Sequence, residues 1–177
     1  SPAPAAAATA PGAPPPSANA DPEAFCSLGG CRSRTAGMTI DTDGHIADLA
    51  LRARIQREDP WHHAETSLTY SNGRSLDPTR VPYVVIPKED LSYKLGDLVL
   101  VQYQGRSRLA VVGDRGPKGR FGEGSIALAK ALGIDPHGKT GGVGTGVTYQ
   151  FLGWTLARPR DEAGLLAALS TSEEARN

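Results

Sequence analysis

Residues 109–134 read LAVVGDRGPKGRFGEGSIALAKALGI, and they predict a strand, a turn and a helix in that order. The run 109–112 is apolar and β-branched, as a buried strand is. The Gly- and Pro-rich residues 113–117 are typical of a turn that breaks the strand. Ser125 is a candidate helix N-cap, and Gly133 is placed to end the helix. The apolar face of this helix consists of Ile126, Leu128, Ala129, Leu132 and Ile134.

Two carboxylates lie at the edges of the Gly-rich segment between this strand and this helix. Asp114 follows the strand, and Glu123 precedes the helix. Two acids held near one another by a strand end and a helix start suit general acid–base chemistry. A structural interpretation also fits, in which Asp114 makes a turn hydrogen bond and Glu123 favours the helix N-terminus. The spacing alone leaves both interpretations open.

Four stretches, in order along the chain, resemble the family-75 glycoside hydrolases, the fungal-type chitosanases. They are MTIDTDG at 38–44, VPYVVIP at 81–87, GDRGP with GEGSIALAKALGI within 113–134, and GVTYQFLG at 146–153. The DRGP motif, followed by an apolar helix and a closing strand, is also similar to double-psi β-barrel proteins. That group includes the rare-lipoprotein-A-like peptidoglycan hydrolases and the expansins.

The resemblance implies both a fold and an activity. The implied fold is mainly β: a small closed six-stranded β-barrel of double-psi type, with one internal helix and an N-terminal covering layer. The implied activity is endo-acting hydrolysis of the β-1,4 bonds of chitosan with inversion, in which one carboxylic acid protonates the glycosidic oxygen and one carboxylate activates water. Asp114 and Glu123 match the family's two essential acids. We expect Glu123 to be the acid and Asp114 the base, although the related double-psi hydrolases use the Asp of the DRGP-like motif as donor.

Other residues are expected to contact the substrate. Asp41 and Asp43 are two positions apart, so on a strand their carboxylates point to one face. Such an acidic cleft would attract glucosamine units, which are partly cationic near neutral pH. Trp61 fits either a sugar-stacking platform or a core position. The expected substrate-binding set is Asp41, Asp43, Trp61, Glu65, Thr66, Tyr83, Arg115 and Ser125.

Other functions stay open at this point. A peptidoglycan hydrolase of the rare-lipoprotein-A type acts on largely uncharged amino sugars and would not need the pair Asp41 and Asp43. An expansin-like wall-binding module without catalysis would keep Trp61 but tolerate loss of Glu123. A secreted barrel with a decayed site is the third alternative. An inverting hydrolase predicts that its two catalytic carboxyl groups lie about 6.5–9.5 Å apart.

Composition limits the partners. The chain has 177 residues with 19 basic and 19 acidic side chains, and this balance gives no support to nucleic-acid binding or to a polybasic membrane patch. No apolar run approaches the ~20 residues that a membrane helix needs. We expect a monomer that acts on a polysaccharide without a cofactor. A disulfide between Cys26 and Cys31 is favoured over free thiols; it implies an oxidising compartment and a secreted protein.

No metal site is expected. The sequence DTDG at 41–44 begins as a calcium loop does, but the twelfth position is Arg52 where the loop requires Glu. Adjacent histidines, as at 62–63, rarely bind one metal together, and the chain has only four histidines. Two cysteines without a second pair of ligands do not make a zinc site.

The chain divides into three parts by composition. The Pro/Ala-rich residues 1–22 predict a disordered linker or tail, residues 23–158 the catalytic barrel, and residues 159–177 a tail or short helix. Residues 46–58 fit either a short helix or a covering loop. Within the barrel, the expected strands are 81–87, 96–103 and 146–154, with a hairpin turn at 104–107.

Overall fold

The computed structural model describes residues 22–27, 29 and 31–174. The predicted linker at 1–22 therefore lies outside the described residues except for Pro22, which begins the first helix. In chain order the elements are α1 (Pro22–Ser27), β1 (Arg32–Asp41), α2 (Leu49–Glu58), β2 (Tyr83–Pro87), β3 (Asp97–Tyr103), β4 (Arg106–Gly116), β5 (Glu123–Ser125), α3 (Ile126–Ala131), β6 (Val143–Thr155) and α4 (Glu162–Glu174).

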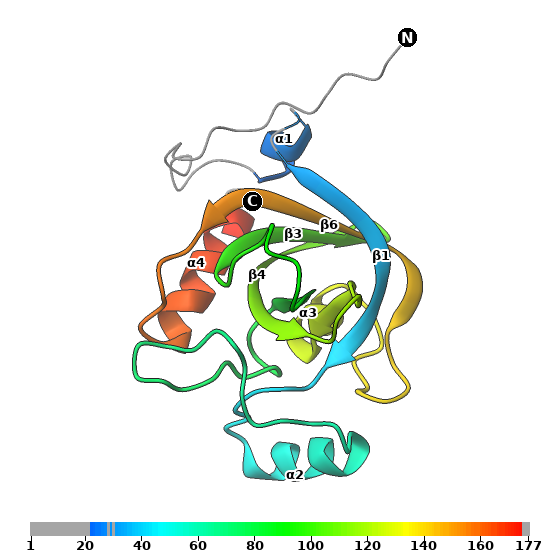
Figure 1. The fold of residues 1–177 in the computed structure, drawn as a ribbon, viewed down its shortest axis with the longest axis vertical. Helices are drawn as coiled ribbons and strands as arrows, with labels where there is room; N and C mark the ends of the chain where they lie inside the picture. The colour runs from blue at the N-terminus through cyan, green and yellow to red at the C-terminus, as the bar shows by residue number, and fades with distance from the viewer. Residues whose placement is uncertain (1–21, 28, 30, 175–177) are drawn as a thin grey trace.

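The strands close into a six-stranded barrel in the order β1-β5-β2-β4-β3-β6 (Figure 1). The pairs β1–β5 and β2–β4 are parallel, and the other four pairs are antiparallel. Closure pairs every strand on both sides and so leaves no open sheet edge. The expected mainly β, closed six-stranded barrel with a helix inside the β region is confirmed.

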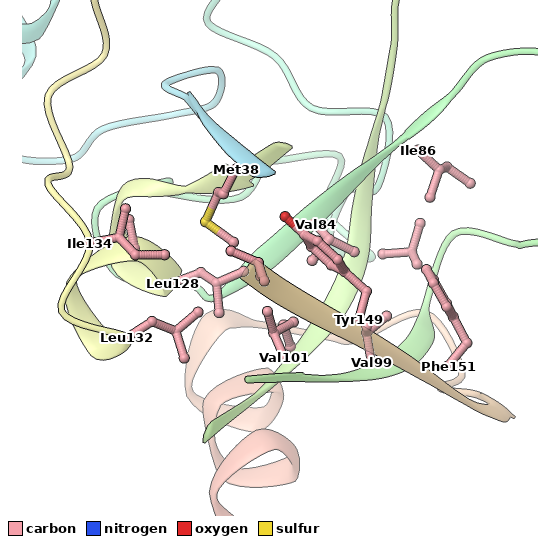
Figure 2. Close-up of a cluster of buried hydrophobic side chains, with 14 of the residues drawn as sticks. Met38, Val84, Ile86, Val99, Val101, Leu128, Leu132, Ile134, Tyr149 and Phe151 are labelled. Atoms are coloured by element: carbon pink, nitrogen blue, oxygen red, sulfur yellow. The ribbon is translucent and has the colours of Figure 1, made fainter. Parts of the chain in front are cut away.

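The interior of the barrel is filled by alternate residues of its strands. Val84 and Ile86 of β2 point inward with Val99 of β3, and Figure 2 shows them meeting Tyr149 and Phe151 of β6. Side chains alternate between the two faces of a strand, so every second residue reaches this cluster. The two-faced pattern predicted for 146–154 is confirmed, since Leu152 belongs to a different cluster outside the barrel.

Helix α3 closes one end of this interior. Ser125 caps it as predicted, because the Ser125 hydroxyl accepts a hydrogen bond from the Leu128 N–H at 3.2 Å. Leu128 and Leu132 are buried among the inward-facing side chains (Figure 2). Gly133 ends the helix with φ +72°, a conformation that side chains larger than glycine's disfavour.

The outer face of the barrel has a second apolar cluster. Tyr83 and Val85 of β2 pack there with Val111 of β4, and α4 covers them with Leu165 and Leu169. The cysteines at the N-terminal end form the expected disulfide, Cys26–Cys31, and pack against the same cluster. No helix among the described residues is long and apolar enough to cross a membrane.

The turn predicted at residues 113–117 is wrong. Strand β4 continues to Gly116, because its residues Asp114 to Gly116 pair in parallel with the end of β2. The backbone hydrogen bonds between β4 and its neighbour β2 outweigh the local turn preference of Gly-Asp-Arg-Gly. The short strand β5 was also not predicted, since its Glu-Gly-Ser sequence has no strand pattern of its own.

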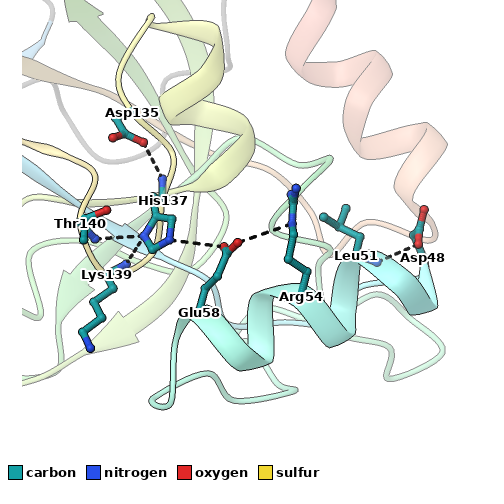
Figure 3. Close-up of polar contacts among 8 residues, drawn as sticks. All are labelled: Asp48, Leu51, Arg54, Glu58, Asp135, His137, Lys139 and Thr140. Carbon is teal, nitrogen blue, oxygen red and sulfur yellow. Dashed lines mark hydrogen bonds and ion pairs between the residues drawn. The ribbon is translucent and has the colours of Figure 1, made fainter.

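Residues Leu49–Glu58 form helix α2, which resolves the alternative between helix and loop. The helix projects beyond the barrel wall in Figure 1 and packs on it through Ile55, which meets Ile46 and Ile126. Its C-terminal end meets the loop after α3, where Glu58 lies 3.7 Å from both Arg54 and His137 (Figure 3). The imidazole Nδ1 of His137 accepts the backbone N–H groups of residues 139 and 140, so its remaining proton is on the nitrogen that faces Glu58.

Candidate active site

A row of residues on the outer face of the barrel runs across four neighbouring strands. Thr39 of β1 is in register with Glu123 of β5, Glu123 with Val85 of β2, and Val85 with Asp114 of β4. Residues in register on adjacent strands direct their side chains to the same face. We call Thr39, Glu123, Val85 and Asp114 the cross-strand row; it places the two predicted catalytic acids on either side of one apolar residue.

A β-bulge turns Asp114 into this row. Val112 points into the barrel, and strict alternation would point Asp114 inward as well. The register between β2 and β4 shifts by one residue between Val84 and Val85, so Val84 faces Val112 while Val85 faces Asp114. An extra residue in one strand reverses the faces that follow it. The bulge at Gly113 therefore brings the carboxylate to the outer face.

The Asp114 carboxylate is held in one orientation. It is 6% exposed, and its Oδ1 accepts the Ser67 hydroxyl at 2.8 Å, the Ser67 N–H at 3.0 Å and the Arg115 N–H at 2.9 Å. Three donors on one oxygen fix the plane of the group and suit an ionised acceptor. Asp114 is thus oriented as a fixed carboxylate.

Glu123 is placed in a different environment. Burial raises the pKa of its carboxyl, and the Asp114 and Asp43 carboxylates raise the pKa further, whereas Arg120 and a hydrogen bond from Thr39 lower it. Gly116 leaves room for this side chain, because a Cβ at Gly116 would lie 3.3 Å from Glu123 Oε2 and 2.9 Å from Val85 Cγ1. The surroundings of Glu123 therefore shift its carboxyl toward the protonated form relative to a free carboxyl.

Asp41 and Asp43 extend the acidic surface beyond the end of β1. The strand ends at Asp41, so the two residues do not share a strand as expected; a hydrogen bond of 2.8 Å from the Asp43 N–H to Asp41 Oδ1 turns the chain and keeps both carboxyls close. Burial raises the pKa of Asp41 well above its usual range, and Asp43 and Asp114 add to that shift. Burial also raises the pKa of Asp43, again with a contribution from Asp114.

Carboxylate oxygens of three residues converge in this surface. One oxygen each from Asp41, Asp43 and Asp114 lies within 4.8 Å of the others, close enough to ligate one cation. Oxygen ligands of this kind suit Mg²⁺ or Ca²⁺. From the sequence we expected these acids to line one acidic cleft, but we expected no metal site.

The peptide between Asp41 and Asp43 is anchored from behind. The buried Thr42 hydroxyl donates to Asp59 Oδ2 at 2.6 Å, and the imidazole Nδ1 of His62 lies 2.7 Å from the Thr42 carbonyl oxygen. Since the carbonyl can only accept, His62 carries its proton on Nδ1. Asp59 and His62 therefore help to set where the two acids lie.

Three of the expected substrate-binding residues are buried and support the site from beneath. Tyr83 is 0% exposed and donates its hydroxyl to the Asp43 carbonyl at 2.6 Å. The Ser125 hydroxyl donates to the Val81 carbonyl and accepts the Tyr83 N–H. Thr66 donates to the Leu68 carbonyl. These side chains are enclosed by protein, so they position the acids and do not reach a ligand in this structure.

The other expected binding residues are nearer the surface. Trp61 is 81% exposed, so it is a surface residue and its core alternative is wrong. Glu65 is exposed on the same loop. The Arg115 guanidinium turns away from the acids and donates to the carbonyls of Asp90 and Tyr93.

Sequence reasoning did not assign roles to two residues that contact the acids directly. Ser67 supplies two of the three donors to Asp114, and Thr39 bonds to Glu123. The signal for Ser67 was its place directly after Glu65 and Thr66, two residues of the expected binding set. Thr39 lies in the MTIDTDG stretch, but its partner Glu123 is on β5, a strand that the sequence does not reveal.

Comparisons with known proteins do not assign this chain to a family. No protein-family model matches the chain, and no curated protein matches it. Among solved structures the chain is similar to the Streptomyces papain inhibitor (SPI), with 20% sequence identity and a TM-score of 0.42 over 68% of this chain and 94% of that chain. A likeness at this level supports no conclusion about fold or activity.

Proposed function

We propose that this protein is a secreted glycoside hydrolase that cuts the β-1,4 bonds of chitosan internally, by an inverting mechanism with two carboxyl groups. The observation on which the proposal rests is the cross-strand row. Asp114 and Glu123 flank Val85 on one face of the barrel; three hydrogen-bond donors hold Asp114, whereas burial raises the pKa of Glu123. Pairs of acids separated in this way are what glycoside hydrolysis requires.

The register supports an inverting spacing. Glu123 on β5 and Asp114 on β4 are separated by one strand, β2. Adjacent strands lie about 4.8 Å apart, so the backbones of the two residues are about 10 Å apart. An inverting pair has its carboxyl groups about 6.5–9.5 Å apart, which leaves room for a water molecule, and this backbone separation is compatible with that range. A retaining pair, with carboxyls about 5 Å apart, would suit neighbouring strands better.

The proposed roles follow from the two environments. Glu123, protonated, donates its proton to the glycosidic oxygen as the bond from that oxygen to the sugar carbon breaks. Asp114, ionised, accepts a proton from the water whose oxygen attacks that carbon from the opposite side. Each turnover leaves Glu123 ionised and Asp114 protonated, and exchange with solvent restores both.

Chitosan is supported as the substrate by the charge of the surface around the row. Asp41 and Asp43 add carboxyl groups beside Asp114, with one oxygen of each of the three residues within 4.8 Å of the others. An acidic surface concentrates a polymer of glucosamine, whose amines are partly protonated near neutral pH. The exposed ring of Trp61, two residues after Asp59, offers an apolar face on which a pyranose can stack.

The test is mass spectrometry of chitosan hexamer after incubation with wild type and with Glu123→Gln. Wild type should yield shorter oligomers, and the variant should be slower by about 10³-fold because it has no proton to donate. Glu58→Gln, on α2, is the matched control and should keep full activity.

Two outcomes would redirect the proposal. Cleavage of peptidoglycan but not of chitosan would favour a wall hydrolase of the rare-lipoprotein-A type. Binding of wall polysaccharide without cleavage by either folded protein would favour an expansin-like binding module. In a cleaving wild type, an α-configured product at the new reducing end, measured by NMR at early times, would establish inversion.

A further inference from the structure

Two segments of the chain lie side by side behind the candidate active site. We call residues 41–44 the acid loop and residues 59–63, which follow α2, the platform segment. The His63 N–H donates to Asp43 Oδ1 at 2.8 Å, and the Gly44 N–H donates to the His63 carbonyl at 2.9 Å. Because these bonds join the two segments, a shift of the platform segment also shifts the acid loop.

The carboxylate of Asp59 makes a second link between the two segments. Its Oδ2 accepts the Thr42 hydroxyl at 2.6 Å, and its Oδ1 accepts the Trp61 N–H at 2.9 Å. Two hydrogen bonds, one on each oxygen, fix the plane of a carboxylate. One group therefore holds the middle of the acid loop at a set place relative to the Trp61 backbone.

The contact between Asp59 and Thr42 is enclosed by the surrounding chain. Thr42 is 3% exposed, and its carbonyl accepts a hydrogen bond from His62 Nδ1 at 2.7 Å. Gly138, in the loop after α3, packs against both residues, since a Cβ there would lie 2.7 Å from Thr42 Cγ2 and 3.3 Å from Asp59 Cβ. The two side chains therefore have little room to shift apart.

Trp61 is exposed to solvent close to the acids. The residue is 81% exposed, and it lies two positions before His63, which bonds to Asp43. Two residues span at most about 7 Å, so the Trp61 backbone lies near the acid loop. A sugar polymer bound over the acids is therefore within reach of the indole, which offers it an apolar face.

We propose that Asp59 is a positioning residue, which holds the Trp61 ring and the acid loop at the separation that one sugar chain requires. This inference rests on the proposed function for the identity of that chain and for the stacking of a sugar on Trp61. Without Asp59 the two contact points move relative to one another, and ordering them on binding costs part of the affinity that they supply. The contribution of Trp61 to binding should therefore depend on Asp59.

The experiment is calorimetric titration of chitosan hexamer into the Glu123→Gln protein, with Trp61→Ala introduced alone and together with Asp59→Ala. Alone, Trp61→Ala should weaken binding about tenfold, a typical loss for a stacked aromatic contact. In the Asp59→Ala background the same substitution should weaken binding less than about twofold, because the ring is already out of place. Independent sites would instead give the same factor in both backgrounds.

Two further variants separate positioning from a general disturbance. Asp59→Asn has an amide oxygen that can accept the Trp61 N–H and an NH₂ group that can donate to the Thr42 hydroxyl, so the tenfold effect of Trp61→Ala should return. Glu58→Ala, at the neighbouring acid on α2, is the matched control and should leave the tenfold effect intact.

Thr42→Val tests the link from its other end and serves if Asp59→Ala does not fold. Valine has the shape of threonine without the hydroxyl, so the substitution removes the 2.6 Å hydrogen bond and leaves Asp59 in place. The effect of Trp61→Ala should fall to about threefold in this background. A full tenfold effect would show that the link to Thr42 does not position the ring.

The outcomes separate this inference from the proposed function. If wild type cleaves hexamer and Trp61→Ala costs tenfold with or without Asp59, the positioning role is wrong and the enzyme stands. If Trp61→Ala binds hexamer as tightly as the parent, the stacking and the positioning role are both wrong, whereas cleavage by wild type would still support the enzyme. If wild type leaves hexamer intact and Glu123→Gln binds no oligomer, the enzyme and the positioning role are both wrong.

Discussion

The two faces of β2 and β4 differ near the carboxyl ends of these strands, where only the outer face has acids beside it. Inside the barrel, Val84 and Ile86 pack with Val112 in a closed apolar cluster. Outside, Val85 lies between Asp114 and Glu123. The inner face fixes the register because a slip of one residue would bury polar groups in it. The outer face tolerates two partly buried acids because the register is already fixed from within.

The largest effect is expected on activity from a change confined to the outer face. Asp114→Asn keeps an oxygen that can accept from Ser67 but removes the proposed base, so kcat on chitosan hexamer should fall by about 10³-fold. Tm should stay within a few degrees of wild type. Asp135→Asn, an exposed acid on the loop after α3, is the control. Full activity in a folded Asp114→Asn protein would remove Asp114 from the mechanism.

A substitution on the inner face is expected to lower stability more than activity. Ile86→Ala leaves a cavity in the closed cluster and should lower the free energy of unfolding by about 2–5 kcal/mol. Urea denaturation measures this loss, and the activity per folded molecule should change less than in Asp114→Asn. Leu91→Ala, at a side chain 83% exposed, should cost under about 0.5 kcal/mol. Similar losses in both variants would contradict the assignment of Ile86 to the core.

A smaller effect on activity is expected from Ser67, which orients the outer carboxylate. Ser67→Ala removes the hydroxyl donor at 2.8 Å but keeps the backbone donor, so kcat should fall about tenfold with little change in KM. Ser67→Thr retains a hydroxyl and should recover part of the loss. Ser71→Ala, at an exposed serine on the next turn, is the control. A change in KM alone would indicate that Ser67 binds substrate instead.

The smallest effect is a pH-dependent one at Asp41. Its pKa is raised in the folded state, so the folded protein binds this proton more tightly than the unfolded chain and loses stability as pH rises above about 4, the unfolded pKa, through the raised value. Asp41→Asn removes that loss. The variant should match wild type below about pH 4 and have the higher Tm at pH 7. Equal Tm values across this range would show that the pKa of Asp41 is not raised in the folded protein.

The sequence by itself determined most of the local structure. Alternation predicted the inward and outward faces of 146–154, and Ser125 and Gly133 marked the ends of α3. Cys26 and Cys31 are close enough along the chain for their disulfide to be expected. These features depend on residues that are neighbours in sequence, and local physical chemistry is sufficient for them. Asp114 and Glu123 were selected as candidate catalytic acids differently, through the resemblance of the motifs around them to a known family.

Only the tertiary structure decided how the acids stand relative to one another. The bulge that turns Asp114 outward exists because β4 pairs with β2, and β5 is a strand only because β1 and β2 lie on either side of it. The same pairing buries Tyr83 and Ser125 beneath the site, where motif reasoning expected substrate contacts. These outcomes depend on backbone hydrogen bonds between segments far apart in the chain, and no local pattern encodes such partners.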